Sequence, residues 1–293
     1  MPSPSSTAHV DQAAVEDAAA RLITAADERQ PCPPVRDLIG RDDVRAAYAV
    51  QSVLHERALA AGRRVTGRKI GLTAPAVQAQ LGVDQPDFGV LYADMDVTAD
   101  ATGSGVETTR LLQPKIEAEV AFVLAQDLHS PTADGTFRAE ELADAIAAVV
   151  PALEIVDSRV AGWDISFGDT VADNASSGLY VLGTDRAEPD LFGPDLDAGL
   201  AAVSMTMTRG DTADAEQVSA GHGADCLGSP LRALAWLAAT AVRFGDPLRA
   251  GQVILAGALG PMVPVAAGDT FRADITGLGS VAARFTPSSQ EHS

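Results

Sequence analysis

Two glutamates one residue apart are the first candidates for chemistry in this chain. In the segment PKIEAEVAF, residues 114–122, apolar side chains alternate with Lys115, Glu117 and Glu119. An extended strand would place the apolar set on one face and both glutamates on the other. Two interpretations are open at this point. The glutamate face points to water, as in many antiparallel strands, or the two carboxylates share a cation.

A third carboxylate, Glu154, lies inside the apolar run VVPALEIV, residues 149–156. A buried, unpaired carboxylate is costly, so a partner is expected. That partner is either a cation held jointly with Glu117 and Glu119, or an arginine such as Arg159. Because no thiolate or imidazole lies nearby in the sequence, the three carboxylates predict a hard ion, Mg2+ or Mn2+, with positions left open for water or substrate.

Two candidates for acid/base chemistry lie in TGRKIGLTAPAVQAQLGVDQPDFGVLYADM, residues 66–95. Lys69 is placed between Gly67 and Gly71 in an apolar β run, where burial or a nearby metal would lower its pKa toward a useful range. Asp87 follows in a QPDFG turn. Taken alone, each also fits a simpler description: a lysine with its ammonium in water and a turn aspartate.

The elements that must position these residues are mostly short β-like runs, which begin at Arg64 and are separated by Gly, Pro and Asp. Apolar residues at three- and four-residue spacing predict helices over 9–29, 41–62, 138–150 and 229–245. The last has Ser229 and Pro230 at its start and Gly245 at its end, which are typical boundary residues.

The order of these elements predicts an α+β fold rather than a doubly wound sheet, because strands and helices do not alternate regularly. The chain has 293 residues, of which 46% are hydrophobic and 21% charged, as in globular proteins. We expect an N-terminal helical segment over residues 1–63, a β-rich catalytic body over 64–285 and a polar tail over 286–293.

Composition and motif searches exclude several classes of function. The net charge of −19 and the lack of a basic stripe argue against nucleic acid as a partner. There is no run of eighteen apolar residues and no signal-peptide pattern, so we expect a cytoplasmic protein with no membrane span. The two cysteines, Cys32 and Cys226, are too few for a disulfide framework. Phosphate-binding glycine motifs, a GxSxG elbow and an HExxH helix are absent from the sequence.

At these residues the sequence resembles the 2-keto-4-pentenoate hydratase family, within the fumarylacetoacetate hydrolase superfamily. The resemblance runs from the N-terminal helices to Phe285 and rests on GRKIGLTAPAVQAQLGVDQPDFGVLYADM, LLQPKIEAEVAFVLAQDL, PALEIVDSR, VADNASSGLYVLG and ILAGALGPMVPVAAGDTFRADITGLGSV. It implies a mixed, rolled β-sheet body with a smaller N-terminal helical part, assembled as a homo-oligomer, often a decamer.

The resemblance also implies roles for the candidate residues. It assigns Glu117, Glu119 and Glu154 to a divalent metal, and Lys69 and Asp87 to the acid/base end of the site. By resemblance alone, a further set positions the substrate, orders water or lines an apolar wall: Leu72, Asp173, Asn174, Ser176, Ser177 and Val265. A polar turn before a strand is the alternative description of the ADNASS segment.

The implied activity is the metal-dependent addition of water to 2-hydroxypenta-2,4-dienoate (2-oxopent-4-enoate), which gives 4-hydroxy-2-oxopentanoate in meta-cleavage degradation of aromatics or steroids. The segment GALGPMVPV, residues 257–265, favours this hydratase over the 4-oxalocrotonate decarboxylases, which share the lysine, the glutamates and the ADNASS segment. The C–C bond hydrolases are disfavoured because no histidine lies between His55 and His129 to act as their base. An inactive binding subunit, associated with a neighbouring pathway enzyme, is a further alternative.

Overall fold

The protein is described here by a computed structural model that covers residues 10–74, 78, 83–210 and 215–287. Residues 1–9, 75–77 and 79–82 of the lysine motif, 211–214 and 288–293 of the polar tail lie outside the described residues. In the described part of the chain, no helix combines the length and the apolar composition that crossing a membrane requires.

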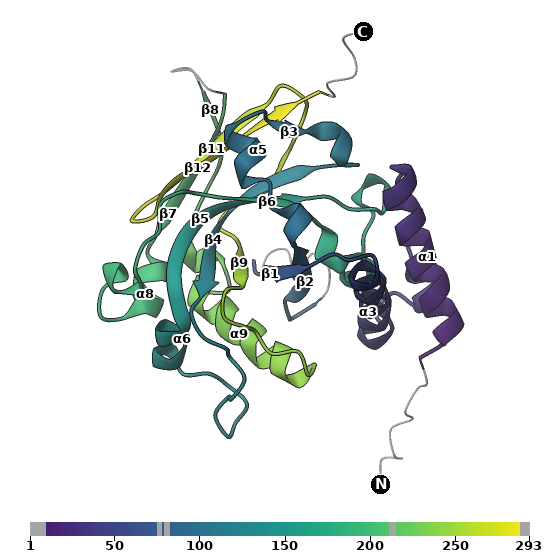
Figure 1. Ribbon diagram of the computed structural model, residues 1–293, viewed down its shortest axis with the longest axis horizontal. Helices are drawn as coiled ribbons and strands as arrows, with labels where there is room; N and C mark the ends of the chain where they lie inside the picture. Colours follow the sequence, from purple (N-terminus) through teal and green to yellow (C-terminus); the bar gives the residue numbers. More distant parts are fainter. Residues whose placement is uncertain (1–9, 75–77, 79–82, 211–214, 288–293) are drawn as a thin grey trace.

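The N-terminal part is helical, as the residue spacing predicts. Helices α1 (Gln12–Glu28) and α3 (Val44–Ala60) begin after Asp11 and Asp43, whose carboxylates accept hydrogen bonds from the first backbone amides. The short α2 (Arg36–Ile39) lies between them in the chain, and α3 also packs against α7 (Phe167–Ala172). Figure 1 shows α1 and α3 together at one side of the molecule, where their apolar faces form a core with α7.

The larger sheet carries the candidate residues. Among the described residues it has seven strands, six of them in the order β2-β1-β9-β4-β5-β6, with β10 paired to β4. Strands β1 and β9 are parallel and the other neighbours are antiparallel, so the sheet is mixed. Their bounds are β1 Val65–Gly71, β2 Asp87–Tyr92, β4 Lys115–Leu124, β5 Ile146–Val156, β6 Ser177–Leu182, β9 Val253–Ala258 and β10 Val263–Pro264.

A second sheet packs next to the first. In the described residues its order is β3-β12-β11-β7-β8, with bounds β3 Val106–Glu107, β7 Ser204–Arg209, β8 Glu216–His222, β11 Thr270–Ile275 and β12 Gly279–Thr286. Three further helices connect the strands: α5 (Thr98–Thr102), α6 (Ala139–Ala145) and α8 (Leu196–Ala201). The long strands β4 and β5 curve across the middle of the molecule in Figure 1, which gives the body its rolled shape.

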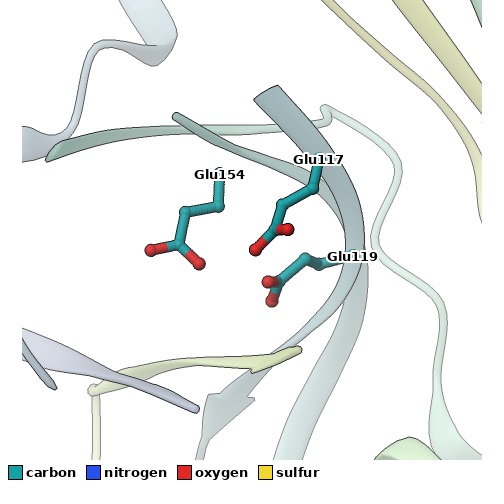
Figure 2. A group of neighbouring side chains, drawn as sticks. All are labelled: Glu117, Glu119 and Glu154. Atoms are coloured by element: carbon teal, nitrogen blue, oxygen red, sulfur yellow. The ribbon is translucent and has the colours of Figure 1, made fainter. Parts of the chain in front are cut away.

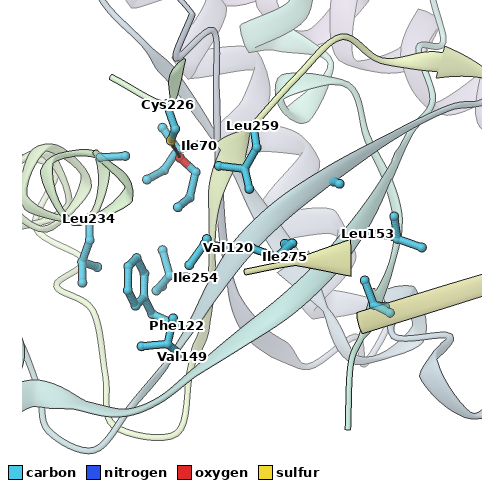
Figure 3. Packing of buried hydrophobic residues seen from close by; sticks show 14 of the residues in the cluster. Ile70, Val120, Phe122, Val149, Leu153, Cys226, Leu234, Ile254, Leu259 and Ile275 are labelled. Carbon is cyan, nitrogen blue, oxygen red and sulfur yellow. Dashed lines mark hydrogen bonds between the residues drawn. The ribbon is translucent and has the colours of Figure 1, made fainter. Parts of the chain in front are cut away.

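One face of the larger sheet packs against α9 (Pro230–Arg243) and forms the main core. Figure 3 shows Leu234 of this helix close to Phe122 and Ile254. The α9 boundaries agree with the predicted helix, since Ser229 caps it and Gly245 follows its end with a φ of 77°. The α+β fold with a rolled, mixed sheet and N-terminal helices is therefore confirmed.

The helix predicted over 138–150 is correct in its first half and wrong from residue 146 onward. Helix α6 ends at Ala145, and β5 begins at Ile146. Residues 146–156 pair with β4 over most of its length, and the β-branched side chains of Ile146, Val149 and Val150 suit this pairing. Sheet pairing therefore overrides the helical spacing of the AIAAVV segment.

Candidate metal centre and active site

Three glutamates converge on one point inside the larger sheet. Strand β4 places Glu117 and Glu119 on the same face, and the β4–β5 register sets Glu154 directly opposite Glu117. One carboxylate oxygen from each lies within 4.8 Å of the others, and Figure 2 shows the three side chains directed at the same space. Glu119 and Glu154 are 0% and 1% exposed, so the glutamate face does not point to water.

The carboxylates have few partners of their own. Glu119 Oε2 accepts a 2.8 Å hydrogen bond from the amide of Gly257, whereas Glu119 Oε1 and both oxygens of Glu154 have no hydrogen-bond partner among the described residues. Arg159, the alternative partner of Glu154, instead forms an ion pair with Asp173. Unsatisfied buried oxygens at this spacing are the donor set that a hard divalent cation requires.

Burial raises the pKa of each glutamate, and repulsion between the carboxylates adds to this shift for Glu117 and Glu119. Desolvation and the nearby charge of Glu154 raise the pKa of Glu117 to about 7. The same causes, together with Glu117, raise the pKa of Glu119 well above its ordinary value. Burial also raises the pKa of Glu154, although the Lys69 ammonium opposes this shift. Without a cation, the cluster therefore binds protons near neutral pH.

Lys69 lies beside this cluster. Its side chain on β1 is buried, its Nζ is 3.2 Å from Glu154 Oε1, and it donates a 2.9 Å hydrogen bond to the carbonyl of Ala175. Burial alone would lower the pKa of Lys69, but Glu154 and Asp87 outweigh burial and raise it. The prediction that burial lowers the pKa of Lys69 is therefore wrong for the metal-free protein. Several carboxylates surround the ammonium, and the sequence did not show that they lie so close to it.

Asp87 is the first residue of β2 rather than a turn residue, and its backbone pairs with Gly71. Its side chain is buried, and burial raises its pKa. Oδ2 accepts a 3.4 Å hydrogen bond from the Thr170 hydroxyl, while Oδ1 has no hydrogen-bond partner among the described residues. An unpaired oxygen and the Lys69 ammonium thus face the interior of the site from adjacent strands.

Most polar side chains of the ADNASS segment form hydrogen bonds with neighbouring groups of the protein. The Asp173 carboxylate accepts hydrogen bonds from Ser158 and from the Arg159 amide, and the Asn174 side chain bonds to the backbone of Val90. The Ser177 hydroxyl donates to the Asn174 carbonyl. Of the four polar candidates, Ser176 is the one whose side chain is linked by hydrogen bonds to the acid/base pair in the described residues.

The connection of Ser176 runs through Thr170. The two hydroxyl oxygens are 3.3 Å apart, and Thr170 in turn bonds to Asp87. Leu72 and Val265 are both half-buried, but they pack against different cores: Leu72 against the N-terminal helices and Val265 against the main core. The two residues of the proposed apolar wall thus belong to different apolar clusters.

Three groups near the site were not singled out from the sequence. They are the Thr170 hydroxyl, the Ala175 carbonyl and the Gly257 amide. The last two are backbone groups, whose role cannot be predicted from residue type. Gly257 belongs to β9, and its φ of 112° aims its amide at Glu119.

Comparisons with known proteins find similar chains over nearly the whole length. The family model described as fumarylacetoacetate (FAA) hydrolase C-terminal matches residues 65–286. The TodF product hydratase of Pseudomonas putida is 52% identical over 274 residues, covering 93% of this chain and 95% of the relative. The 2-keto-4-pentenoate hydratase 2 of Dechloromonas aromatica is 51% identical over 274 residues, covering 93% and 97%.

A solved structure is similar over the same extent. The 4-oxalocrotonate decarboxylase from Pseudomonas putida G7, complexed with magnesium and adipate, superimposes with a TM-score of 0.82 at 32% identity and covers 94% of this chain and 99% of its own. The same decarboxylase was also solved with calcium and acetate. Both ions in that protein are hard divalent cations of the kind that oxygen ligands prefer.

Proposed function

Because this chain belongs to the 2-keto-4-pentenoate hydratase family of the fumarylacetoacetate hydrolase superfamily, we propose that it catalyses the metal-dependent hydration of 2-hydroxypenta-2,4-dienoate to 4-hydroxy-2-oxopentanoate. One observation carries this proposal over its alternatives. The hydratase relatives are 51–52% identical across nearly the whole chain, whereas the similar decarboxylase structure is 32% identical.

We assign the metal to Glu117, Glu119 and Glu154. The residues fit a hard divalent cation, since all three offer carboxylate oxygens and Glu119 and Glu154 retain unsatisfied, buried ones. When bound there, Mg2+ or Mn2+ supplies a Lewis acid that polarises the 2-oxo acid group of the substrate and offsets the charge of the carboxylates. The remaining chemistry is proton transfer by the chain's own residues.

The first step is ketonisation of the dienol. Asp87 Oδ1, which has no hydrogen-bond partner among the described residues, accepts the proton of the 2-hydroxyl group. Lys69 Nζ keeps its proton until this point because its pKa is raised, and it delivers that proton to C5. The product of this step is the conjugated 2-oxo-3-enoate, with Asp87 protonated and Lys69 neutral.

The second step is hydration. Water adds its oxygen at C4, and the neutral Lys69 amine accepts the proton that this water loses. Asp87 returns its proton to C3, so both residues regain their starting protonation states and 4-hydroxy-2-oxopentanoate is formed. The Thr170 hydroxyl, which donates to Asp87 Oδ2, keeps the other oxygen of the carboxylate directed at the substrate.

Product identification tests this proposal. Freshly generated 2-hydroxypenta-2,4-dienoate is added to the purified protein with Mg2+ or Mn2+, the loss of dienol absorbance is followed, and the product is identified by NMR. We expect 4-hydroxy-2-oxopentanoate in the presence of metal and none after EDTA treatment. Metal-independent turnover, or a product other than the hydroxy acid, would overturn the assignment.

Decarboxylation of 4-oxalocrotonate is the second candidate, and one observation favours it. The decarboxylase structure that superimposes on this chain was solved with a dicarboxylate and magnesium. The same chelated 2-oxo acid would act as the electron sink for loss of CO2. Release of CO2 from 4-oxalocrotonate without hydration of the dienoate would identify the chain as a decarboxylase. If neither substrate is converted, the result would favour a binding role.

We further propose that the chain works as a homo-oligomer in the cytoplasm, as a decamer or in a complex with a neighbouring pathway enzyme. An assembly would cover some of the four large apolar side chains that the described residues expose: Leu59, Leu191, Phe244 and Met262 are 47%, 63%, 54% and 43% exposed. Light scattering coupled to gel filtration measures the mass of the assembly. A monomer at micromolar concentration would contradict this part of the proposal.

A further inference from the structure

Three successive residues between α7 and β6 adopt the left-handed backbone conformation. Asn174, Ala175 and Ser176 have φ values of 54°, 53° and 51°. Side chains other than glycine are disfavoured in this region, and a run of three is unusual. Such a strained turn persists only when its surroundings hold it, and strain of this kind concentrates at functional sites.

The Asn174 side chain holds the turn against β2. Its Oδ1 accepts a 2.8 Å hydrogen bond from the amide of Val90, and its Nδ2 donates a 2.9 Å hydrogen bond to the carbonyl of the same residue. The side chain therefore pairs with one residue of β2 in the way a neighbouring strand would. Gly89 permits this approach, because a side chain there would collide with the Asn174 carbonyl.

The turn presents two groups to the acid/base pair. The Ala175 carbonyl accepts a hydrogen bond from Lys69 Nζ at 2.9 Å, and the Ser176 hydroxyl lies 3.3 Å from the Thr170 hydroxyl that bonds to Asp87. A lysine ammonium has three N–H donors. The carbonyl accepts one and the Glu154 carboxylate attracts a second, so two of the three N–H groups are accounted for by these contacts.

We propose that Asn174 is a positioning residue for the proton-transfer steps: by clamping the left-handed turn to β2, it aims the Ala175 carbonyl and so sets where Lys69 Nζ lies. The expected effect on turnover rests on the proposed function. The hydrogen bonds by which Asn174 holds the turn against β2 do not depend on the substrate. Asn174 acts through Lys69 and makes no contact with the substrate in this scheme.

Two substitutions of Asn174 distinguish the effect of its side-chain hydrogen bonds from the effect of its strained backbone conformation. Asn174→Gly removes the side-chain hydrogen bonds but accepts the left-handed φ without penalty, whereas Asn174→Ala removes the bonds and retains the strain. If the clamp positions Lys69, both variants lower kcat by about tenfold to a hundredfold, while KM for the dienoate and the affinity for Mn2+ change by less than about threefold. If Asn174 only relieves strain, the glycine variant keeps the kcat of the wild type.

Gln51 provides a matched control. Its buried amide Nε2 donates hydrogen bonds of 2.9 Å to the backbone carbonyls of Phe88 and Val171, so it also ties β2 to the neighbouring helix but does not contact the turn. We expect Gln51→Ala to lower the melting temperature about as much as Asn174→Ala and to keep kcat within about twofold of the wild type. An equal loss of kcat in both variants would overturn the inference.

Crystal structures of the variants give a readout that does not depend on turnover. Displacement of Lys69 Nζ from the Ala175 carbonyl in Asn174→Gly supports the clamp, and an unmoved Lys69 overturns it. If the wild type does not hydrate the dienoate, the proposed function fails while this structural test still decides the role of Asn174. If Asn174→Ala fails to fold, the glycine variant carries the test.

Discussion

Replacing Glu119 by glutamine should stabilise the metal-free protein and abolish its response to metal. Glutamine has nearly the same shape and can still accept the 2.8 Å hydrogen bond that Gly257 donates to Glu119 Oε2. The substitution removes one negative charge from a group of three carboxylates, two of which are fully buried. Loss of that charge relieves repulsion when the site holds no cation and removes a ligand when it does.

The size of the effect follows from the geometry. At the outer separation of 4.8 Å and an effective dielectric constant of about 20, two full charges repel by about 3.5 kcal/mol. Protonation relieves part of this repulsion, because burial and Glu154 raise the pKa of Glu117 to about 7. We therefore expect Glu119→Gln to raise the free energy of unfolding of the metal-free protein by about 2 kcal/mol at neutral pH. For a chain of 293 residues, the melting temperature should rise by about 3 °C.

Thermal unfolding with EDTA and with Mn2+ is the assay. For the wild type, saturating metal should raise the melting temperature, since a ligand present at about 100 times its Kd adds about 2.7 kcal/mol. For Glu119→Gln, the melting temperature should be higher than that of the wild type in EDTA and unchanged by metal. Glu56→Gln, the same substitution on the exposed side of α3, is the control and should change neither value. A variant that is less stable in EDTA and still responds to Mn2+ would refute the reasoning.

Three further outcomes are expected. Lys69→Met should lower kcat by at least about a hundredfold and leave Mn2+ binding in calorimetry intact, because Lys69 transfers protons and is not a ligand; unchanged kcat would contradict its role. Phe122→Ala should lower the free energy of unfolding in urea by about 3–5 kcal/mol, because Phe122 is fully buried in the main core; a loss below about 1 kcal/mol would contradict the packing. Arg159→Ala should cost about 3–5 kcal/mol in the same assay, because it leaves the buried Asp173 carboxylate without its cation; an unchanged denaturation midpoint would contradict this.

Much of this site could be predicted from side-chain alternation. The spacing of Glu117 and Glu119 placed both on one face of β4, and the cost of burying Glu154 required a partner. The sequence could not decide whether that face met water. The structure shows that it does not, because Ala121 on the glutamate face of β4 belongs to a further apolar cluster, separate from the main core and from the core of the N-terminal helices. Both faces of β4 are therefore covered.

The groups that escaped prediction are those whose role depends on backbone conformation. The left-handed φ of Ala175 could not be predicted from its residue type, because alanine rarely adopts this conformation. The Ala175 carbonyl and the Gly257 amide act as main-chain atoms, so their positions follow from the fold alone. The boundary at Ile146 was missed because pairing with β4, a long-range contact, outweighs local helical spacing.

Turnover of 2-hydroxypenta-2,4-dienoate in deuterated water, with Mg2+ present, tests the central claim most directly. The account predicts metal-dependent formation of 4-hydroxy-2-oxopentanoate that carries one deuterium at C5 and one at C3, because separate proton transfers reach these two carbons. Hydroxy acid without deuterium at C5 would contradict ketonisation before hydration, and the absence of metal-dependent product would contradict the hydratase assignment itself.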